Sequence, residues 1–503
     1  MTKILKLILV TVTFIFIALP TSAGKLVVAF SADPGGFDPQ RGPSGMSHVA
    51  IEQVYSTLLR LDENAKPYEG LAVNWSQSTD GLRWNFKLRD GVKFHNGEDL
   101  TAEDVKFSFD RIRKPDSGYA YLSQVEAIAE VNVINRLTVE FVLKNPVGPF
   151  EIYMAFPGSS IVPKDTVESG WDLNEKPIGS GPFVFDRYVP KNGIYFKKNN
   201  NYYESGKPQF DELDYRIITD PTALSNALKS GEVHLSNEVP PKDWNTIINM
   251  PGMVDASIEG SRYYWMIPNH TRPPLDNPKV RQAIGIAINR AAIVKGAFYG
   301  QATPILGGVI PKWNWGYAGI NYFKERGDIE KAKQLLIEAG VKKGTEINLM
   351  MVSTWPPMMS MAPIIQANLL QIGLKSKIDT MEVPRYWDEI WAPSKFDLTV
   401  MYWLSPLADP DDFVTNTYLS TSPVNTQKGG SKEMDDILMK AKSTVSEKDR
   451  KNIYYQQQKL SLDTMDVIPL VNGWVLTAHT DKLKNFKPMR TGFLKTLKDA
   501  YFD

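Results

Sequence analysis

Hydrophobic and polar positions alternate along several stretches of the chain, as they do in half-buried β-strands. The segment 82–94 alternates on both sides of the dipeptide Asp90-Gly91, and a two-residue turn of this kind predicts a β-hairpin. The apolar run at 25–30 predicts a first buried strand. The segments 346–352 and 396–403 predict two further strands.

Other stretches repeat their apolar residues with the period of a helix and carry helix start and stop signals. Thr101 opens a capping box, and Asn277-Pro278 supplies a cap followed by a proline at the first helical position. Asp328 caps another predicted helix. The segments 221–230 and 363–372 each predict a helix that ends at a following glycine. Because strands alternate with helices, the chain is predicted to be an α/β protein with parallel sheets.

The amino terminus has the layout of a secretory signal peptide. Lys3 and Lys6 precede an apolar stretch, Pro20 ends it, and small residues follow up to Ala23. The apolar stretch is shorter than the roughly 20 residues that a membrane span needs. We therefore expect 1–23 to be cleaved and the mature protein to be periplasmic, in a Gram-negative bacterium.

Composition removes several classes of function. The chain has no cysteine, which excludes thiol catalysis, disulfides and thiolate metal sites. It also lacks the cysteine through which an exported protein could carry a lipid anchor. Lysine and arginine (57) balance aspartate and glutamate (57), so no basic excess points to nucleic acid. A chain of this length is predicted to form two or three domains.

No catalytic, metal or cofactor site is predicted. The five histidines are scattered, and no pair lies at i and i+4. Gly179-Ser-Gly181 has the wrong spacing for a serine hydrolase, and no phosphate-binding glycine loop occurs. The acidic segment 409–412 lacks the spacing of an EF-hand. It is better interpreted as a helix N-terminus, where acids cap free N–H groups.

Aromatic residues gather near breaks in the pattern. Aromatic faces in a cleft bind apolar groups, sugar rings or cations. Trp355 and Trp403 follow or end predicted strands, and ligands of α/β proteins bind outside the carboxyl ends of their strands. The whole set is Tyr263, Tyr264, Trp265, Trp313, Trp315, Trp355, Tyr402, Trp403 and Trp474.

These segments, taken in order, resemble the peptide/nickel-type solute-binding proteins of ABC importers, family 5. The resemblance covers nearly the whole mature chain. It is carried by residues 82–97 with 100–105, 177–183, Asn269 with 273–276 and 280–283, Trp403 with 409–413, and 468–470. The resemblance implies a two-lobed type II periplasmic-binding-protein fold with an additional mixed α/β domain inserted in the first lobe.

The same resemblance implies a domain plan and a mechanism. The first lobe would combine 24–49, 178–265 and 476–503. The extra domain would fill 50–177, and the second lobe 266–475. Two crossings, near 266 and 475, would form a hinge. A ligand held between the lobes would favour the closed state because both lobes contact it.

Two departures from the family pattern bear on the ligand. Peptide-binding members carry an aspartate for the ligand's amino terminus three residues after the equivalent of Trp403, where this chain has Pro406. Dipeptide binders also carry an arginine on the loop matching 352–357, and this loop has none. Buried unpaired ligand charges cost several kcal/mol, so a free dipeptide is disfavoured, although Asp409 could replace the aspartate from a shifted position.

We therefore predict a periplasmic solute-binding protein that captures a peptide or peptide-like molecule and delivers it to an inner-membrane ABC permease. An oligosaccharide or an opine-like conjugate is an alternative ligand, and a secreted hydrolase is a third hypothesis. The protein is predicted to be a monomer without enzymatic activity. The predicted ligand-binding residues are Tyr263, Trp265, Asn269, Trp355, Trp403 and Asp409.

Overall fold

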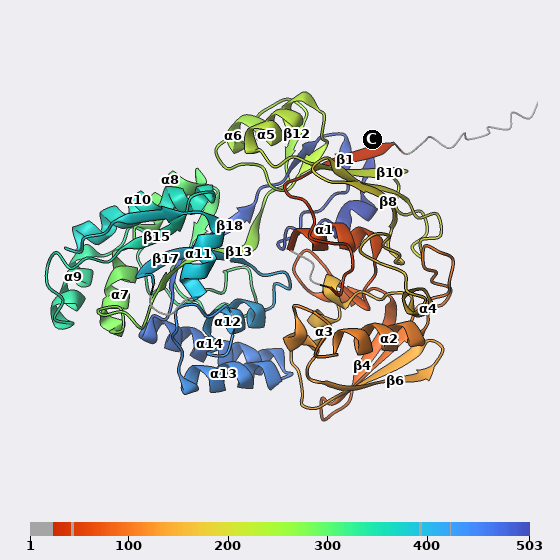
Figure 1. Ribbon diagram of the computed structural model, residues 1–503, viewed down its shortest axis with the longest axis horizontal. Coiled ribbons are helices and arrows are strands. Elements are labelled where there is room, and N and C mark those ends of the chain that lie inside the picture. The colour runs from red at the N-terminus through yellow and green to blue at the C-terminus, as the bar shows by residue number, and fades with distance from the viewer. Residues whose placement is uncertain (1–23, 42–44, 392–394, 423) are drawn as a thin grey trace, which may run out of the picture.

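The computed structural model describes residues 24–41, 45–391, 395–422 and 424–503. The predicted signal peptide at 1–23 lies outside these residues. Figure 1 shows two halves side by side, with a third part below the right-hand half. None of the helices in the described ranges is long and apolar enough to cross a membrane.

The first lobe is built on a mixed seven-stranded sheet. Its central strand β1 (Lys25–Phe30) is buried along nearly its whole length and runs parallel to both neighbours. In sheet order the strands are β12 (Met253–Asp255), β19 (Ala478–Thr480), β11 (Leu235–Ser236), β1, β10 (Glu212–Ile217), β9 (Gly193–Lys198) and β8 (Phe183–Val189). The helices of this lobe are α1 (Gly45–Val54), α5 (Pro221–Ser230), α6 (Trp244–Ile248) and the 3-10 helix η3 (Lys495–Asp499), and a small ribbon is formed by β20 (Leu483–Lys484) and β21 (Tyr501–Phe502).

The extra domain has its own antiparallel sheet and core. Trp84, Phe86 and Leu88 alternate inward on one strand, and Phe109 and Phe141 pack against them. The sheet order is β4 (Ala72–Gln77), β5 (Arg83–Leu88), β7 (Thr138–Leu143) and β6 (Ile128–Asn135), with a ribbon of β2 (Leu59–Leu61) and β3 (Pro67–Glu69). Its helices are α2 (Ala102–Ile112), α3 (Phe150–Tyr153), α4 (Lys164–Glu168), η1 (Leu122–Gln124) and η2 (Pro157–Ser159).

The second lobe surrounds a six-stranded mixed sheet. The order is β14 (Ala302–Pro304), β18 (Ile468–Val475), β13 (Ile258–Pro268), β17 (Leu398–Leu404), β15 (Leu349–Val352) and β16 (Ile378–Met381). Strands β17, β15 and β16 run parallel. The helices are α7 (Pro278–Ala287), α8 (Arg290–Phe298), α9 (Ile329–Glu338), α10 (Pro356–Gln371), α11 (Val383–Trp391), α12 (Pro410–Tyr418), α13 (Lys432–Ser443) and α14 (Glu447–Thr464). One core lies between this sheet and α7, α8 and α10, and a second lies towards α11 to α14.

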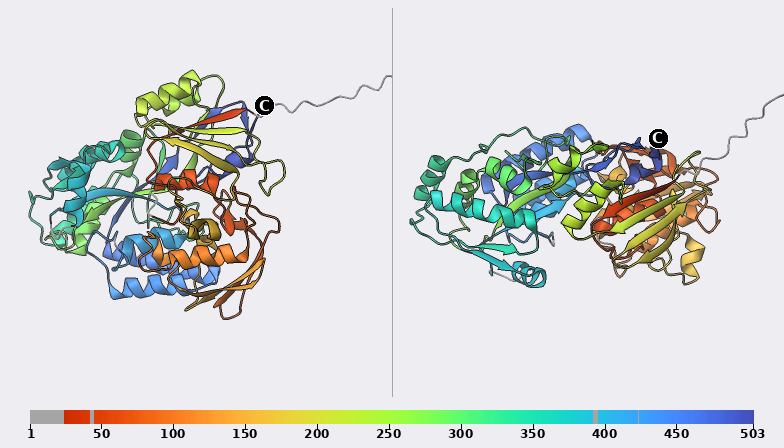
Figure 2. Two further views of the ribbon diagram at one scale, coloured as in Figure 1. Left: turned by 45° about the vertical axis from the view of Figure 1, so that its right-hand side comes forward. Right: turned by 90° about the horizontal axis from the view of Figure 1, so that it is seen from above.

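The chain passes between the two large sheets twice. It leaves the first sheet after Asp255 and enters β13 at Ile258, and it returns between Val475 and Ala478. The predicted boundary at 265/266 therefore falls inside β13. Figure 2 shows the crossing strands at the join of the halves. The division into domains by residue range remains a prediction.

Several local predictions are confirmed. Thr101 caps α2 with a reciprocal capping box, and Asn277 and Asp328 cap α7 and α9 through their side chains. Asp220 caps α5 by accepting from Ala223 N at 2.7 Å. Gly231 ends that helix with a φ of 75°. Residues with a Cβ atom disfavour this left-handed conformation, whereas glycine adopts it readily.

Three local predictions are wrong. β5 pairs with β4 and β7, so Asp90-Gly91 does not join a hairpin. The helix predicted at 363–372 begins seven residues earlier at Pro356, because Pro356 and Pro357 occupy first-turn positions where no N–H is needed, and Pro363 lies inside it. The two large sheets are mixed and not parallel throughout, because antiparallel neighbours flank their parallel strands.

Candidate ligand-binding cleft

The carboxyl ends of the three parallel strands of the second lobe meet at one edge of its sheet. Trp355 lies just beyond β15, α11 follows β16, and Tyr402 and Trp403 stand near the end of β17. This edge faces the first lobe. Ser261 N–H donates to Arg490 O at 2.7 Å, and Arg262 lies 3.6 Å from Glu238. Such an edge is where open α/β sheets bind ligands.

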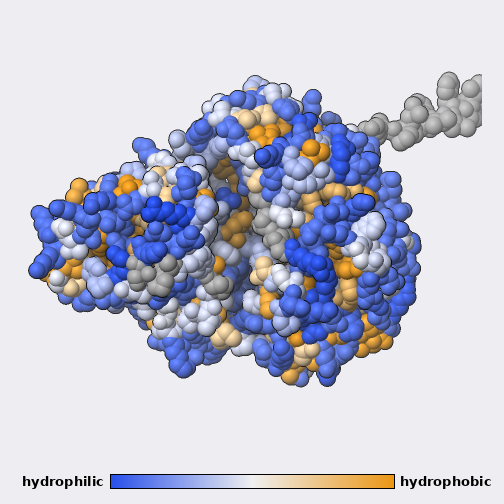
Figure 3. Space-filling model, viewed as in Figure 1, coloured by the Kyte–Doolittle hydropathy of each residue, from blue (hydrophilic) through white to orange (hydrophobic). Residues whose placement is uncertain are grey.

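Figure 3 shows a hollow between the two halves whose floor carries apolar residues. A cavity of about 10 Å³ lies where the three parts of the molecule meet. Pro406 and Ala408 of the loop after β17 form one side of it. The other sides come from the β2–β3 ribbon (Leu61, Asp62, Glu63 and Ala65) and the carboxyl-terminal tail (Met489, Arg490, Thr491, Phe493 and Lys495). The predicted position of the family's aspartate, Pro406, therefore does line the interlobe junction.

Trp355 belongs to a continuous aromatic cluster. Its ring centroid lies 5.5 Å from that of Tyr386, 6.1 Å from Trp387 and 6.0 Å from Tyr402. Tyr402 is 38% exposed. Trp387 stacks on Trp391 at 6.1 Å, so the cluster continues along α11 to the surface. The sequence analysis did not select Trp387, whose spacing of four from Trp391 on one helix face was the available signal.

Trp403 and Tyr263 are cross-strand neighbours. β17 and β13 pair antiparallel with Tyr263 opposite Trp403 and Trp265 opposite Met401. Tyr263 stacks on Trp265 with ring centroids 4.8 Å apart, and its hydroxyl donates to Phe413 O at 3.0 Å. Burial raises the pKa of Tyr263 well above its usual value. Three predicted site residues, Tyr263, Trp265 and Trp403, are therefore brought together.

The indole Nε1 atoms of Trp265 and Trp403 are buried and have no hydrogen-bond partner within the described part of the chain. Trp265 is 3% exposed, whereas Trp403 is half-buried. Buried polar groups are normally bonded, so an unpaired donor calls for an explanation. An acceptor on a captured solute would satisfy the Trp403 donor.

Asp409 is committed to the protein itself. It is the N-cap of α12 and accepts from Asp411 N at 2.9 Å. Its carboxylate forms a buried ion pair with Arg450, 2.6 Å from Nη2. Burial alone would lower the pKa of Arg450, but Asp409 and the neighbouring Tyr454 raise it above its ordinary value. The side chain is thus occupied by a cap and an ion pair.

The two acids that follow are also bonded internally. Asp411 accepts from Tyr153 OH of the extra domain at 3.0 Å and from Thr415. Asp412 accepts from Ser405 and from Asn416, and burial raises the pKa of its carboxyl to about 7 despite the Ser405 hydrogen bond. The acidic segment therefore docks α12 on its surroundings, as the helix-cap interpretation expects.

Asn269 is separated from the other predicted site residues. It follows the last residue of β13, next to the start of β17, whereas Trp403 is near the end of β17. Asn269 is fully buried, its Nδ2 donates to Phe396 O at 3.0 Å, and its Oδ1 accepts from Thr271 N at 3.0 Å. These bonds fix a turn at the far end of the strand pair.

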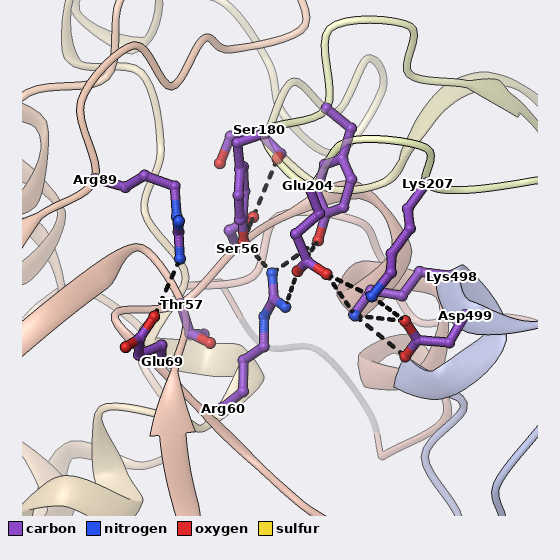
Figure 4. A network of polar contacts seen from close by, with 12 residues as sticks. Ser56, Thr57, Arg60, Glu69, Arg89, Ser180, Glu204, Lys207, Lys498 and Asp499 are labelled. Carbon is purple, nitrogen blue, oxygen red and sulfur yellow. Dashed lines mark hydrogen bonds and ion pairs between the residues drawn. The ribbon is translucent and has the colours of Figure 1, made fainter.

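A polar network holds the extra domain on the first lobe. Figure 4 shows Arg60 reaching Glu204, which also accepts from Lys498 at 2.9 Å, while Lys207 lies 2.6 Å from Asp499. Burial would raise the pKa of Glu204, but Arg60 and Lys498 lower it below its usual range. The network joins these two parts of the molecule to each other.

No group of three histidine, aspartate or glutamate side chains that could hold a metal ion occurs within the described ranges. The structure also assembles no nucleophile with a neighbouring base at the cleft residues described above. What this region offers is aromatic surface around Trp355 and Tyr402, and behind it two buried indole N–H groups that have no partner among the described residues. A two-lobed α/β protein with such a cleft between its lobes belongs to the class that captures solutes.

The comparison with known families agrees with this class. The model of the bacterial extracellular solute-binding proteins, family 5 (middle region), matches residues 66–425. The chain therefore belongs to the bacterial extracellular solute-binding proteins of family 5. The predicted family and the predicted role as a solute-binding protein of ABC importers are confirmed.

Relatives and a solved structure match along nearly the whole chain. The glutathione-binding protein GsiB of Salmonella paratyphi A is 29% identical over 95% of this chain and 94% of its own. Di/tripeptide-binding protein 2 of Pseudomonas aeruginosa is 29% identical, covering 93% of both chains. The periplasmic binding protein DppA of Helicobacter pylori, solved with peptide STSA, is 28% identical over 95% of this chain and 98% of that chain, with a TM-score of 0.82. The two-lobed type II periplasmic-binding-protein fold with an additional mixed α/β domain is confirmed.

Proposed function

We propose that this protein captures a short peptide or peptide-like solute in the interlobe cleft and delivers it to an ABC permease of the inner membrane. The observation that carries the proposal is the edge around Trp355, Tyr402 and Trp403. This edge combines aromatic surface with the buried Nε1–H of Trp403, to which a peptide carbonyl could accept a hydrogen bond. The peptide ligands named for relatives and for the solved neighbour support the same class of ligand.

The manner of binding follows from the charges around the cleft. Asp409 is paired with Arg450, and proline occupies position 406. We propose that the ligand's amino terminus is not held by an ion pair. Trp265 and Trp403 would instead donate hydrogen bonds to peptide groups and pack against ligand side chains. Tyr263 supports Trp265 from within the core. Asp409 acts by holding the backbone around the cleft, and Asn269 fixes the turn at the opposite end of the strand pair.

The remaining parts of the proposal concern the cell. The protein is exported by the signal at 1–23, acts in the periplasm as a monomer and performs no chemistry on its ligand. The family of its relatives supports a binding rather than an enzymatic role. Closure over the ligand would present the permease with a different surface from that of the open state.

Calorimetric titration of the purified protein with matched peptides tests this proposal. Tri- and tetrapeptides are compared with the same peptides acetylated at the amino terminus. We expect binding without turnover and a change of less than about fivefold in Kd on acetylation, which corresponds to about 1 kcal/mol. Failure of every peptide to bind would refute the function. Loss of binding on acetylation would show that an ion pair holds the terminus.

A further inference from the structure

His48 is a buried side chain whose two ring nitrogens find no hydrogen-bond partner among the described residues. It lies in α1 of the first lobe and is 1% exposed. Neither Nδ1 nor Nε2 has a hydrogen-bond partner in the described part of the chain. An unpaired buried polar group costs stability that a packed apolar side chain would not cost. A ring with two such atoms therefore requires an explanation.

The surroundings of His48 are aromatic and come from three segments. Phe156 meets the imidazole edge-on at 4.9 Å, Tyr121 lies at 5.6 Å and Phe493 at 6.5 Å. Burial, and to a lesser extent the positive charge of Lys495, lower the pKa of His48 to about 3. The ring is therefore neutral at physiological pH and carries one N–H donor and one acceptor nitrogen.

This aromatic wall reaches the junction with the second lobe. Phe493, whose ring lies 6.5 Å from the imidazole, also lines the small interlobe cavity, and Pro406 and Ala408 of the second lobe line the same cavity. Trp403 lies three residues before Pro406. His48 is thus one ring removed from the junction at which the loop after Trp403 meets the first lobe. Both His48 and Trp403 carry a buried nitrogen with no partner in the described residues.

We propose that His48 is the ligand-binding residue of the first lobe and that its imidazole bonds an uncharged peptide group of the captured solute. A peptide group offers one N–H and one carbonyl, which complement the acceptor and the donor of a neutral imidazole. The rings of Tyr121, Phe156 and Phe493 surround this contact with apolar surface, which disfavours an ionised group. This inference rests on the proposed function and assigns the ligand contact that the first lobe contributes to closure.

The test combines affinity with stability in the full-length mature protein. In His48→Phe an aromatic ring, one atom larger than imidazole, is kept and both unpaired nitrogens are removed. We expect its melting temperature without ligand to equal or exceed that of the wild type, while the Kd for the tightest-binding tetrapeptide of the calorimetric series rises at least tenfold. In His48→Gln, which keeps one donor and one acceptor, at least a third of the affinity should remain.

His95→Phe is the matched control. His95 is also a buried histidine, but its Nδ1 accepts from Gly179 N at 3.5 Å and its Nε2 lies 3.1 Å from Gly181 O. This variant should melt at a lower temperature and bind the tetrapeptide as the wild type does. A His48→Phe protein that melts lower and binds normally would overturn the inference. A wild type that binds no peptide would instead overturn the proposed function.

Discussion

At the scale of single residues, Trp403 joins a large apolar ring to an N–H that no described residue accepts. Trp403→Phe should keep the ring contact with the second-lobe core but lose the N–H donor. Because of this lost hydrogen bond, we expect the peptide Kd to rise by about fivefold to tenfold. Trp403→Ala should raise it further, because the aromatic surface is lost as well. Calorimetry measures both. Equal affinity in all three proteins would remove Trp403 from the site.

Asp409 is predicted to stabilise the protein rather than to contact the ligand. Asp409→Asn leaves Arg450 buried without its counter-ion, which costs about 3 kcal/mol of unfolding free energy in comparable cases. Chemical denaturation should show this loss, and Arg450→Met in the same chain should recover part of it. A variant with wild-type stability and lost affinity for a cationic peptide would contradict this assignment.

Asp412 should make stability depend on pH. Burial raises the pKa of its carboxyl in the folded state to about 7, whereas the unfolded value is about 3.9. The folded state holds the proton more tightly, so this contribution to stability is complete below about pH 3.9 and is lost as the pH rises to 7.

Asp412→Asn removes this titration. Relative to the wild type, the variant should gain about 2–3 kcal/mol of unfolding free energy between pH 5 and pH 8. Urea unfolding at the two pH values measures the gain. Unfolding curves that shift by the same amount in both proteins would show that Asp412 is ionised throughout this range.

At the scale of elements, the loop between β17 and α12 joins the lobes. Leu407 of this loop is 2% exposed and packs in the core of the extra domain. Leu407→Ala should destabilise the closed arrangement and raise the peptide Kd by about tenfold. Truncating a buried leucine to alanine lowers the free energy of unfolding by about 2–5 kcal/mol. We expect most of this loss to fall on the closed state, because Leu407 makes its contacts with the extra domain there.

Leu143→Ala is the matched control for the loop. Leu143 is buried in the same core but belongs to β7 of the extra domain itself. Its truncation should lower the melting temperature and leave the peptide Kd within about twofold, because it does not join the lobes. Equal effects of the two variants on affinity would show that Leu407 only fills the core.

How much the sequence could predict also differs from element to element. Caps and stop signals placed α5, α7 and α9 correctly, because these signals act within a few residues. The Asp90-Gly91 dipeptide gave a wrong prediction of a hairpin. Strand pairing depends on contacts across the whole sheet, and β7, which pairs with β5, comes from 50 residues further along the chain. Pro363 was wrongly predicted to start a helix, because a proline is tolerated inside a helix when tertiary packing stabilises the remaining turns.

The site could be predicted only in part. The strand-end positions of Trp355 and Trp403 followed from the pattern, and the structure places both at the expected edge. The ion pair of Asp409 with Arg450 could not be foreseen, because 41 residues separate them. His48 gave no signal, since an unpaired side chain is recognised only when its neighbours are known.

At the scale of the whole molecule, the account requires two lobes that close on a solute. The chain crosses between the sheets just before β13 and just after β18, and contacts such as Tyr153 with Asp411 join the extra domain to the second lobe. A saturating peptide should lower the radius of gyration in small-angle scattering and raise the melting temperature. At 100 times Kd the stabilisation is about 2.7 kcal/mol.

Native mass spectrometry of the mature protein mixed with a library of tri- to pentapeptides tests the central claim most directly. The account predicts one-to-one complexes with a subset of the peptides. These complexes should dissociate on denaturation and become fewer in the Trp403→Ala protein. A protein that takes no peptide from the library, or that takes peptides equally well without Trp403, would contradict capture of a peptide in this cleft.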